Sequence, residues 1–243
     1  INAGESNNLT SMKQSFDSLL LTIGMGQSRR LDLAYAKKAD VFTGAEILES
    51  LKLKEKRLRL GEKVIIVGGG NVSMDVATAL LKLGIGEVTV VYRRDREHMP
   101  VFESRFRMAQ QNGMKIMYRT MLDEIVCDDQ AAISGVKLKK MDLKEKEEGR
   151  TVAEPVSDSE FEMDADTVIY AIGQQLDRDL VDQFNLEINE KGRIKVNTAT
   201  NQTSDPFIYA AGSCVERIDT ITTALAKGQQ VARNMVRCML EKD

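Results

Sequence analysis

The feature that most constrains this chain is a glycine-rich loop directly after a short apolar run. Both lie in the stretch VIIVGGGNVSMDVATALLKLG, residues 64–84. The run at 64–67 shows no alternation of polar residues, which is typical of a parallel strand buried on both faces. Residues 71–83 place apolar side chains on one stripe and end at Gly84, which predicts a helix. Strand, loop and helix in this order predict the first half of a βαβ unit.

The loop at residues 68–73, GGGNVS, fits the pattern G-x-G-x-x-[G/A/S] of dinucleotide-binding folds. Gly68 permits a tight turn out of the strand, and Gly70 lets the backbone approach a pyrophosphate. Ser73 is small enough for the helix to lie close to the strand. The free N–H groups and the positive dipole end of the helix would face the phosphates. We therefore predict a dinucleotide site; a glycine-rich turn without a ligand is the alternative.

Two arginines end the next predicted strand, which runs through EVTVVYRR at residues 87–94. A site for NAD(H) usually carries an acid there, because the acid accepts hydrogen bonds from the ribose hydroxyls. Glu87 begins the strand instead of ending it and so falls at the wrong edge of the sheet. Arg93 and Arg94 offer permanently charged forks that suit a phosphate. We predict NADP(H) as the ligand, with Arg96 as a further contact; loosely paired surface arginines are the alternative.

The α/β pattern continues on both sides of this unit. Helices are predicted at 44–58 and 103–112, and a third strand at 114–118, which extends a parallel sheet with right-handed crossovers. From residue 123 the pattern changes to two alternating strands around a turn at Asp128-Asp129, which predicts an antiparallel hairpin. The charge run at 144–150 is interpreted as a solvated loop.

The two ends of the chain carry a second set of apolar strands. Residues 16–26 and 168–173 each contain an apolar strand that stops at Ile-Gly. Further strands are predicted at 192–197 and 203–214, and a closing helix near 220–241. The chain thus divides into three blocks in sequence.

Composition excludes several classes of protein. The net charge of −3 comes without a basic stripe, which argues against nucleic acid as a partner. No apolar run approaches the roughly 20 residues of a membrane span. The three cysteines are widely spaced and form no C-x-x-C, so these residues hold no iron–sulfur cluster or zinc site, and a cytoplasmic protein is expected. The chain lacks a starting Met and a signal peptide, and we expect it to be a piece of a longer protein.

No catalytic role is predicted for the other polar residues. His98, the only histidine, is interpreted as a surface residue. Asp75 is expected to complement the helix dipole. Asp164 and Asp166 are expected to cap or solvate the entrance of a buried strand, and the twelve methionines to fill the core.

Longer motifs go beyond a dinucleotide-binding fingerprint. The chain resembles the pyridine nucleotide-disulphide oxidoreductase superfamily and, within it, the glutamate synthase small-subunit-like flavoproteins. The motifs that carry the resemblance are G-G-G-N-x-[AS]-M-D at 68–75, V-x-V-x-Y-R-R-x-R-x-x-M-P at 88–100, F-x-x-D-A-D-x-V-I-x-A-I-G-Q at 161–174, T-S-x-x-x-x-x-A-A-G at 203–212, and a following helix with Ala224, Gly228 and Ala232.

The resemblance implies an α/β fold, in which a Rossmann-like NAD(P)-binding domain is inserted in a partial, three-layer ββα FAD-binding domain. The expected division is 1–43 and 164–243 for the FAD-binding domain, with 44–163 for the NADPH-binding domain. The strands within 19–24 and 168–173 would lead across the junction. Members of this family pass a hydride from NADPH to FAD, and electrons continue to iron–sulfur clusters or a partner subunit, here an iron–sulfur domain or a large glutamate-synthase-like subunit.

The resemblance also assigns cofactor contacts to individual residues. Together with the glycine pattern, the NADPH contacts fall on Gly68, Gly69, Gly70, Asn71, Val72, Ser73, Arg93, Arg94, Ala171, Ile172 and Gly173. The FAD contacts fall on Gly212, Ser213, Ile221, Thr222 and Thr223. The N-terminus of the closing helix could face the flavin ring edge and stabilise negative charge on the reduced ring.

Two departures from the family pattern concern FAD. The opening G-x-G-x-x-G motif on a first strand is missing, and Gly24-Met25-Gly26 does not open an apolar-striped helix. Ser213 stands where the family has Asp, and its hydroxyl is a weaker acceptor for the sugar-phosphate arm. The leading hypothesis is an NADPH-dependent flavoprotein oxidoreductase, of which this fragment need not be active alone. The alternative is a non-catalytic NADP(H)-binding module that senses nucleotide or scaffolds a partner.

Overall fold

The structure is a computed structural model with two compact units. We call residues 28–173 the inserted unit, and residues 1–27 together with 174–243 the outer unit. Each is described by itself. The residues that the structure describes are 6–34, 40–53, 60–146, 150–217 and 220–241.

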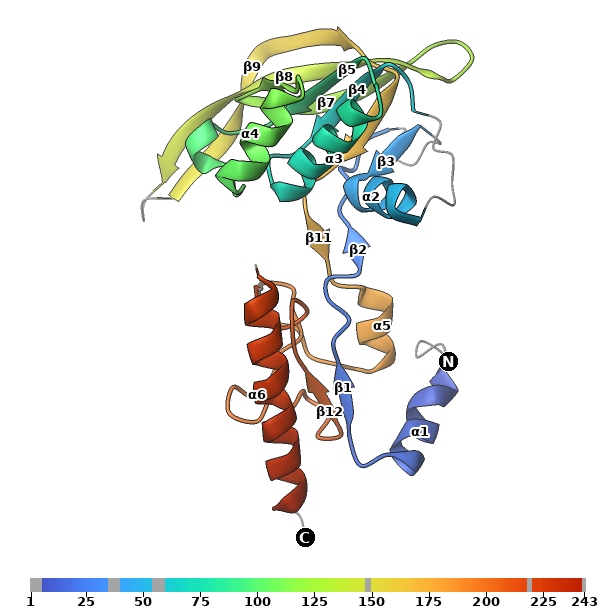
Figure 1. The fold of residues 1–243 in the computed structure, drawn as a ribbon, viewed down its shortest axis with the longest axis vertical. Helices are drawn as coiled ribbons and strands as arrows, with labels where there is room; N and C mark the ends of the chain where they lie inside the picture. The colour runs from blue at the N-terminus through green and yellow to red at the C-terminus, as the bar shows by residue number, and fades with distance from the viewer. Residues whose placement is uncertain (1–5, 35–39, 54–59, 147–149, 218–219, 242–243) are drawn as a thin grey trace. The chain divides into compact units, whose positions relative to one another are not determined.

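A five-stranded parallel sheet forms the centre of the inserted unit (Figure 1). Its order is β3-β10-β4-β5-β6, and every neighbouring pair is parallel. Helices connect successive strands, as the βαβ pattern predicts. The bounds are β3 Val41–Thr43, α2 Gly44–Leu53, β4 Lys63–Val67, α3 Asn71–Lys82, β5 Glu87–Val91, the short 3-10 helix Arg96–His98, α4 Glu103–Gln111, β6 Lys115–Met117 and β10 Thr167–Tyr170.

Different layers cover the two faces of this sheet, and the side chains of β4 contact both layers. Its residues Val64 and Ile66 pack with α2, α3 and α4, whereas Ile65 and Val67 pack with a second sheet. An uninterrupted apolar run is therefore needed, because alternate side chains enter two separate cores. The second sheet is antiparallel, in the order β7-β8-β9 (Figure 1), with bounds β7 Thr120–Cys127, β8 Ile133–Lys146 and β9 Arg150–Asp164.

The hairpin predicted after residue 123 is confirmed, but its partner strand β9 was not predicted. The charge run at 144–150, expected as a solvated loop, instead closes β8 and opens β9; residues 147–149 lie outside the described residues. Opposite charges face each other across this ribbon, with the ammonium of Lys144 2.8 Å from a carboxylate oxygen of Glu154. Cross-strand pairing lets a charged stretch form a strand, since neither face of the ribbon has to be apolar.

The outer unit contains shorter elements than predicted. The apolar stretch at 16–26 forms only β1 (Leu19–Leu21), which pairs in parallel with β12 (Ile208–Ala210). In residues 192–197 only Ile194 is paired, in an isolated bridge with Ile188, and in 203–214 only β12 is a strand. Asn197 and Asp205 instead accept hydrogen bonds from local backbone N–H groups in turns. The remaining elements are α1 Ser6–Ser15, α5 Arg178–Gln183 and α6 Ile221–Leu240, of which α6 was predicted and the other two were not.

The limits of the compact units differ from the division expected at 43/44 and 163/164. Strands β3 and β10 hydrogen-bond to each other, and β10 also to β4, so both belong to the inserted unit. Residues 168–173, which the expected division assigned to the FAD-binding domain, therefore lie in the inserted unit. The chain passes from one unit to the other at residues 27/28 and 173/174, where the short strands β2 (Gln27–Ser28) and β11 (Gln174–Gln175) lie.

Candidate functional site

The candidate site lies at the carboxyl edge of the parallel sheet. Val67 of β4 is paired in register with Tyr170 of β10 and with Val91 of β5. Because these strands are parallel and level, the segments that follow them leave from the same edge. The predicted contacts in the loop 68–70, the arginines and the segment 171–173 therefore follow three adjacent strands.

The first two glycines of the loop are needed because neighbouring atoms fill the space beside them. Gly68 has a φ of +136°, and a Cβ there would overlap the carbonyl group of Ala171. A Cβ on Gly69 would overlap the ring of Tyr92. Both contacts join the loop to the neighbouring strands, so these glycines hold the shape of the site instead of opening space for a ligand.

Gly70 is different, because a Cβ on it would meet nothing within 4 Å. Its φ of −96° is open to any residue. Gly70 also caps α3 without a side-chain hydrogen bond, which leaves the first N–H groups of the helix directed at this open space. An uncapped helix start beside an open glycine fits a pyrophosphate, since the N–H groups and the dipole favour an anion there.

The residues after Gly70 contribute in different ways. Val72 is exposed. Ser73 is fully buried, as the prediction of close helix packing requires, and its hydroxyl has no hydrogen-bond partner among the described residues. The side-chain oxygen of Asn71 accepts a hydrogen bond from the backbone N–H of Phe102 at 2.9 Å. Asn71 thus ties the loop to the start of α4, a role that the sequence did not reveal.

Arg93 and Arg94 follow β5 at this edge, and neither has an ion pair within the described part of the chain. Their neighbours Arg96, Arg105 and Arg119 each pair with a carboxylate. The buried Nε of Arg94 also has no hydrogen-bond partner among the described residues. Because no carboxylate of the described residues pairs with Arg93 or Arg94, these two side chains are suited to bind an anion from outside the chain.

Tyr92 connects the glycine loop to the segment that follows β5. Its ring lies against Gly69, and its hydroxyl donates a 2.7 Å hydrogen bond to the carbonyl of His98. Burial raises the pKa of the Tyr92 hydroxyl, while the charges of Arg94 and Arg93 act to lower it. Both guanidinium groups therefore act electrostatically on the edge where the glycine loop lies.

Three titratable groups near this segment, Asp95, Glu97 and His98, lie close enough together to be considered as metal ligands. Both oxygens of Asp95 are already bonded by the Arg119 guanidinium, at 2.7 Å each. Nδ1 of His98 lies 3.8 Å from Glu97 and has no hydrogen-bond partner among the described residues. A carboxylate engaged on both oxygens does not suit a metal, so this cluster is not assigned as a metal site. His98 is partly buried, whereas the sequence suggested a surface residue.

The acids outside this segment have structural roles. Asp166 accepts hydrogen bonds from the N–H groups of Glu62 and Lys63, and Asp164 pairs with the Lys63 ammonium at 2.7 Å, as expected for the entrance of β10. Asp75 pairs with Arg105 of α4. It lies beyond the first turn of α3, so the expected role with the helix dipole is replaced by an ion pair between two helices.

Glu87 lies at the opposite edge of the sheet from the arginines, as predicted. It begins β5 opposite Lys63, at the amino edge, and pairs with Lys115.

Gly44 opens α2 directly after β3, and a Cβ there would stand 2.6 Å from a methyl carbon of Val72. The start of α2 therefore packs tightly against the start of α3, a contact that the sequence did not indicate.

The predicted FAD contacts all lie in the outer unit. Gly212 follows β12 with a φ of +87° and open space around it. The backbone carbonyl of the next residue, Ser213, accepts a hydrogen bond from Arg193. Ile221, Thr222 and Thr223 form the exposed first turn of α6, where the Thr220 hydroxyl accepts from the N–H of Thr223 at 3.1 Å. One of the helix N–H groups is thus already used for capping.

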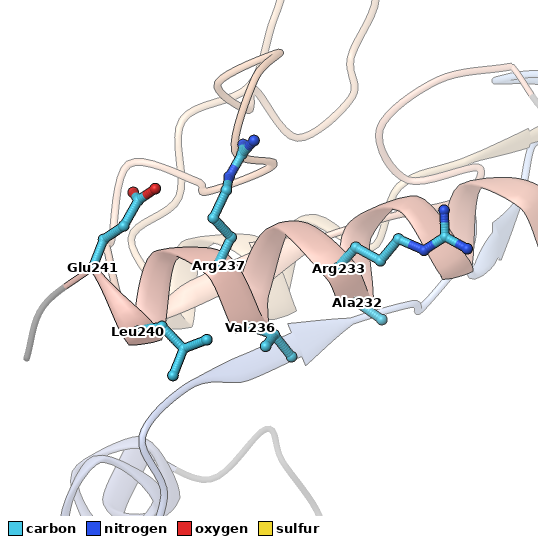
Figure 2. A pocket seen from close by; sticks show the side chains of 6 residues that line it. All are labelled: Ala232, Arg233, Val236, Arg237, Leu240 and Glu241. Atoms are coloured by element: carbon cyan, nitrogen blue, oxygen red, sulfur yellow. The ribbon is translucent and has the colours of Figure 1, made fainter.

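The outer unit also has a shallow pocket along the last turns of α6. None of the predicted cofactor contacts lines it, so it is not part of the candidate site. Figure 2 shows its lining residues, Ala232, Arg233, Val236, Arg237, Leu240 and Glu241. Burial raises the pKa of the Cys214 thiol in the same unit, which favours the protonated thiol over the thiolate. Within the described residues no helix has the length and apolar character needed to cross a membrane.

Comparison with known protein families gives a match over most of the chain. The sequence profile of the pyridine nucleotide-disulphide oxidoreductase family matches residues 4–228. The β subunit of the NADP(+)-dependent formate dehydrogenase of Moorella thermoacetica is 31% identical over 225 residues, which cover 91% of this chain and 31% of that subunit. The small chain of Escherichia coli glutamate synthase [NADPH] is 28% identical over 239 residues, covering 92% and 51%. The chain therefore spans about a third to a half of the length of these relatives.

Solved structures with a similar fold have lower sequence identity. FprA of Mycobacterium tuberculosis, solved in complex with NADPH, has a TM-score of 0.79 at 16% identity and covers 98% of this chain and 68% of its own. The thioredoxin reductase of T. acidophilum has a TM-score of 0.68 at 18% identity, covering 92% and 66%. These similarities show the fold, which is the α/β arrangement expected from the sequence.

Proposed function

This chain belongs to the pyridine nucleotide-disulphide oxidoreductase family, and on that premise we propose that its inserted unit binds NADP(H) for a flavin-dependent oxidoreductase. The relatives named for NADP(+) or NADPH support this choice of nucleotide. The proposed reaction is hydride transfer from NADPH to FAD, as in enzymes that resemble the glutamate synthase small chain.

One observation carries the choice of NADP(H) over NAD(H). Arg93 and Arg94 lie unpaired within the described residues at the carboxyl end of β5, where an acid would hold an unphosphorylated ribose. A 2′-phosphate offers oxygens to both guanidinium groups.

Two segments of the inserted unit would contact the nucleotide, the loop with the start of α3 and the segment 171–173. Gly70 leaves room for the pyrophosphate, and the N–H groups of Asn71 and Val72 at the uncapped helix start would face it. The segment 171–173, whose first carbonyl lies against Gly68, would line the same edge. When bound, NADPH supplies the hydride and FAD accepts it, so the chain has to contribute placement and electrostatics and no side-chain acid or base.

The flavin half of the proposal rests on Gly212, Ser213 and the first turn of α6. Gly212 leaves its surroundings open, and the exposed start of α6 offers a positive dipole end. Ser213 in place of an acid weakens the predicted contact to the sugar-phosphate arm. Electrons would continue to an iron–sulfur domain or a larger subunit; the relatives' designations as a β subunit and a small chain support a multi-subunit setting.

The proposal is tested by calorimetry of the purified chain with NADPH and with NADH. We expect NADPH to bind more tightly by about thirtyfold or more, since charge-assisted bonds to the 2′-phosphate contribute roughly 2–4 kcal/mol. Equal affinities, or no binding of either nucleotide, would contradict the assignment. Flavin absorbance and NADPH-dependent reduction of a one-electron dye test the oxidoreductase part separately.

A second candidate is a nucleotide-binding module without catalysis. The observation that favours it is the serine at position 213, whose carbonyl is bonded by Arg193. A colourless protein that binds NADPH but reduces no dye after incubation with FAD would support this module. A protein that takes up FAD and reduces the dye would exclude it.

A further inference from the structure

We propose that Arg119 is a specificity-determining residue, which keeps Arg93 and Arg94 free for a 2′-phosphate by holding the neighbouring carboxylate of Asp95. This inference rests on the proposed NADP(H) site. Arg119 acts through Asp95 and is therefore a positioning residue and not a direct ligand.

The side chains of Arg119 and Asp95 form a bidentate ion pair, which we call the fork. Nε of Arg119 donates to one oxygen of Asp95 and Nη2 donates to the other, each at 2.7 Å. This bidentate geometry fixes the carboxylate in orientation as well as in charge. Asp95 directly follows Arg94 in the chain and so places a carboxylate next to the arginine segment.

The backbone of Arg119 is bound to the same arginine segment. Its N–H donates to the carbonyl of Arg94 at 3.2 Å, and the N–H of Thr120 donates to the carbonyl of Tyr92 at 3.0 Å. On its other side, the carbonyl of Arg119 accepts from the N–H of Met141 in β8 at 2.8 Å. The turn between β6 and β7 therefore connects the arginine segment to the antiparallel sheet.

Arg119 also has a φ of +47°. A residue other than glycine, asparagine or aspartate adopts this left-handed backbone conformation only at a cost in free energy. A strained backbone persists only where surrounding contacts hold it. The three backbone hydrogen bonds and the fork to Asp95 are such contacts, and together they direct the guanidinium at this one carboxylate.

Electrostatics explain why the fork matters for nucleotide choice. The hydrogen bond from Arg119 holds the pKa of Asp95 below its usual range, and even a carboxylic acid with its usual pKa is ionised near neutral pH. A free carboxylate beside Arg94 would repel a 2′-phosphate or occupy the arginines that should bind it. With the fork in place, the acid and Arg119 neutralise each other. The unphosphorylated ribose carries no charge for a free carboxylate to repel, and its hydroxyls can donate hydrogen bonds to an acid, so freeing Asp95 would not weaken binding of NADH.

The test uses Arg119→Asn, because asparagine tolerates the left-handed backbone while it removes the fork. We expect the affinity for NADPH to fall by about threefold to tenfold, because a negative charge next to the 2′-phosphate site is no longer neutralised, and the affinity for NADH not to fall. The double variant Asp95→Asn with Arg119→Asn should regain most of the affinity for NADPH, because it removes the competing carboxylate. Calorimetry of both nucleotides measures the ratio, and thermal unfolding checks that each variant is folded.

A matched control removes a similar ion pair from the β8–β9 ribbon, by Lys144→Asn alone and together with Glu154→Gln. It should leave both affinities unchanged. An unchanged nucleotide ratio in Arg119→Asn, equal losses for both nucleotides, or no recovery in the double variant would each overturn the proposal. If Arg93→Ala with Arg94→Ala still lowers NADPH binding selectively, the proposed function stands and only the role of Arg119 fails; if that variant has no effect, the proposed function fails too.

Discussion

The carbonyl group of Ala171 occupies the space that a side chain on Gly68 would need. Ala171 follows β10 and Gly68 follows β4, and the two strands are neighbours in the sheet. The backbone N–H of Ala171 also donates to the carbonyl of Val67 at 2.8 Å. Two segments about a hundred residues apart in sequence therefore share one closely packed edge.

Gly68→Ala should destabilise the inserted unit. The methyl group would collide with backbone that cannot rotate away, and the φ of +136° is costly for alanine. We expect the free energy of unfolding to fall by about 2–4 kcal/mol, the sum of overpacking and backbone strain. Denaturant unfolding measures the loss. A stability equal to that of the parent chain would show that this edge is more adaptable than the structure indicates.

Gly70→Ala should weaken nucleotide binding without affecting stability. A Cβ there meets no atom of the chain, but it would enter the space proposed for the pyrophosphate. We expect loss of both NADPH and NADH binding in calorimetry, with an unchanged unfolding midpoint. Gly228→Ala on α6 is the matched control, because its Cβ also meets nothing within 4 Å. Unchanged binding in Gly70→Ala would mean that the loop is not the site.

Replacing Arg93 and Arg94 together by alanine should weaken NADPH binding by roughly 2–4 kcal/mol and hardly affect NADH, because only NADPH offers them a phosphate. Titration calorimetry with both nucleotides measures the difference. Alanine at Arg178 and Arg233, two exposed arginines of the outer unit, removes the same charge and should have no effect. Equal losses for the two nucleotides would rule out the 2′-phosphate role.

Asn71 offers a way to separate the packing of the loop from its charge. Asn71→Ala removes the acceptor for the Phe102 N–H and should lower the free energy of unfolding by about 1 kcal/mol. Asn71→Asp keeps an acceptor, so its stability should stay near that of the parent, but its negative charge should weaken binding of both nucleotides. Unfolding and calorimetry of the two variants test this. If aspartate bound nucleotide as well as asparagine does, residue 71 would not face the phosphates.

Part of the site could be predicted because its signals are local. The strand at 64–67, the loop and helix α3 follow one another within about twenty residues, and their periodicity and glycines determine the turn. Arg93 and Arg94 were identified for the same reason, since they end the next strand of the same βαβ unit. The structure confirms these elements and places the arginines and the glycine loop after adjacent strands.

Other parts depend on which distant residues meet. The charge run at 144–150 extends β8 and begins β9 only because an oppositely charged strand pairs with β8. The limits of the inserted unit follow from hydrogen bonds between β3 and β10, which lie more than a hundred residues apart. A local pattern carries no information about such partners, because register and pairing are set by the whole sheet.

The sequence by itself thus determined a dinucleotide-type strand, loop and helix and the two cations at the end of the next strand, since these require only short-range periodicity and backbone freedom. Only the tertiary structure decided which cations remain available. The chain has 34 basic and 37 acidic residues, so almost any arginine could pair with some acid. Arg119 meets Asp95 and Arg105 meets Asp75 because the β6–β7 turn and α4 bring them there. Ion pairing depends on distances across the fold, and those distances are fixed only when the layers pack.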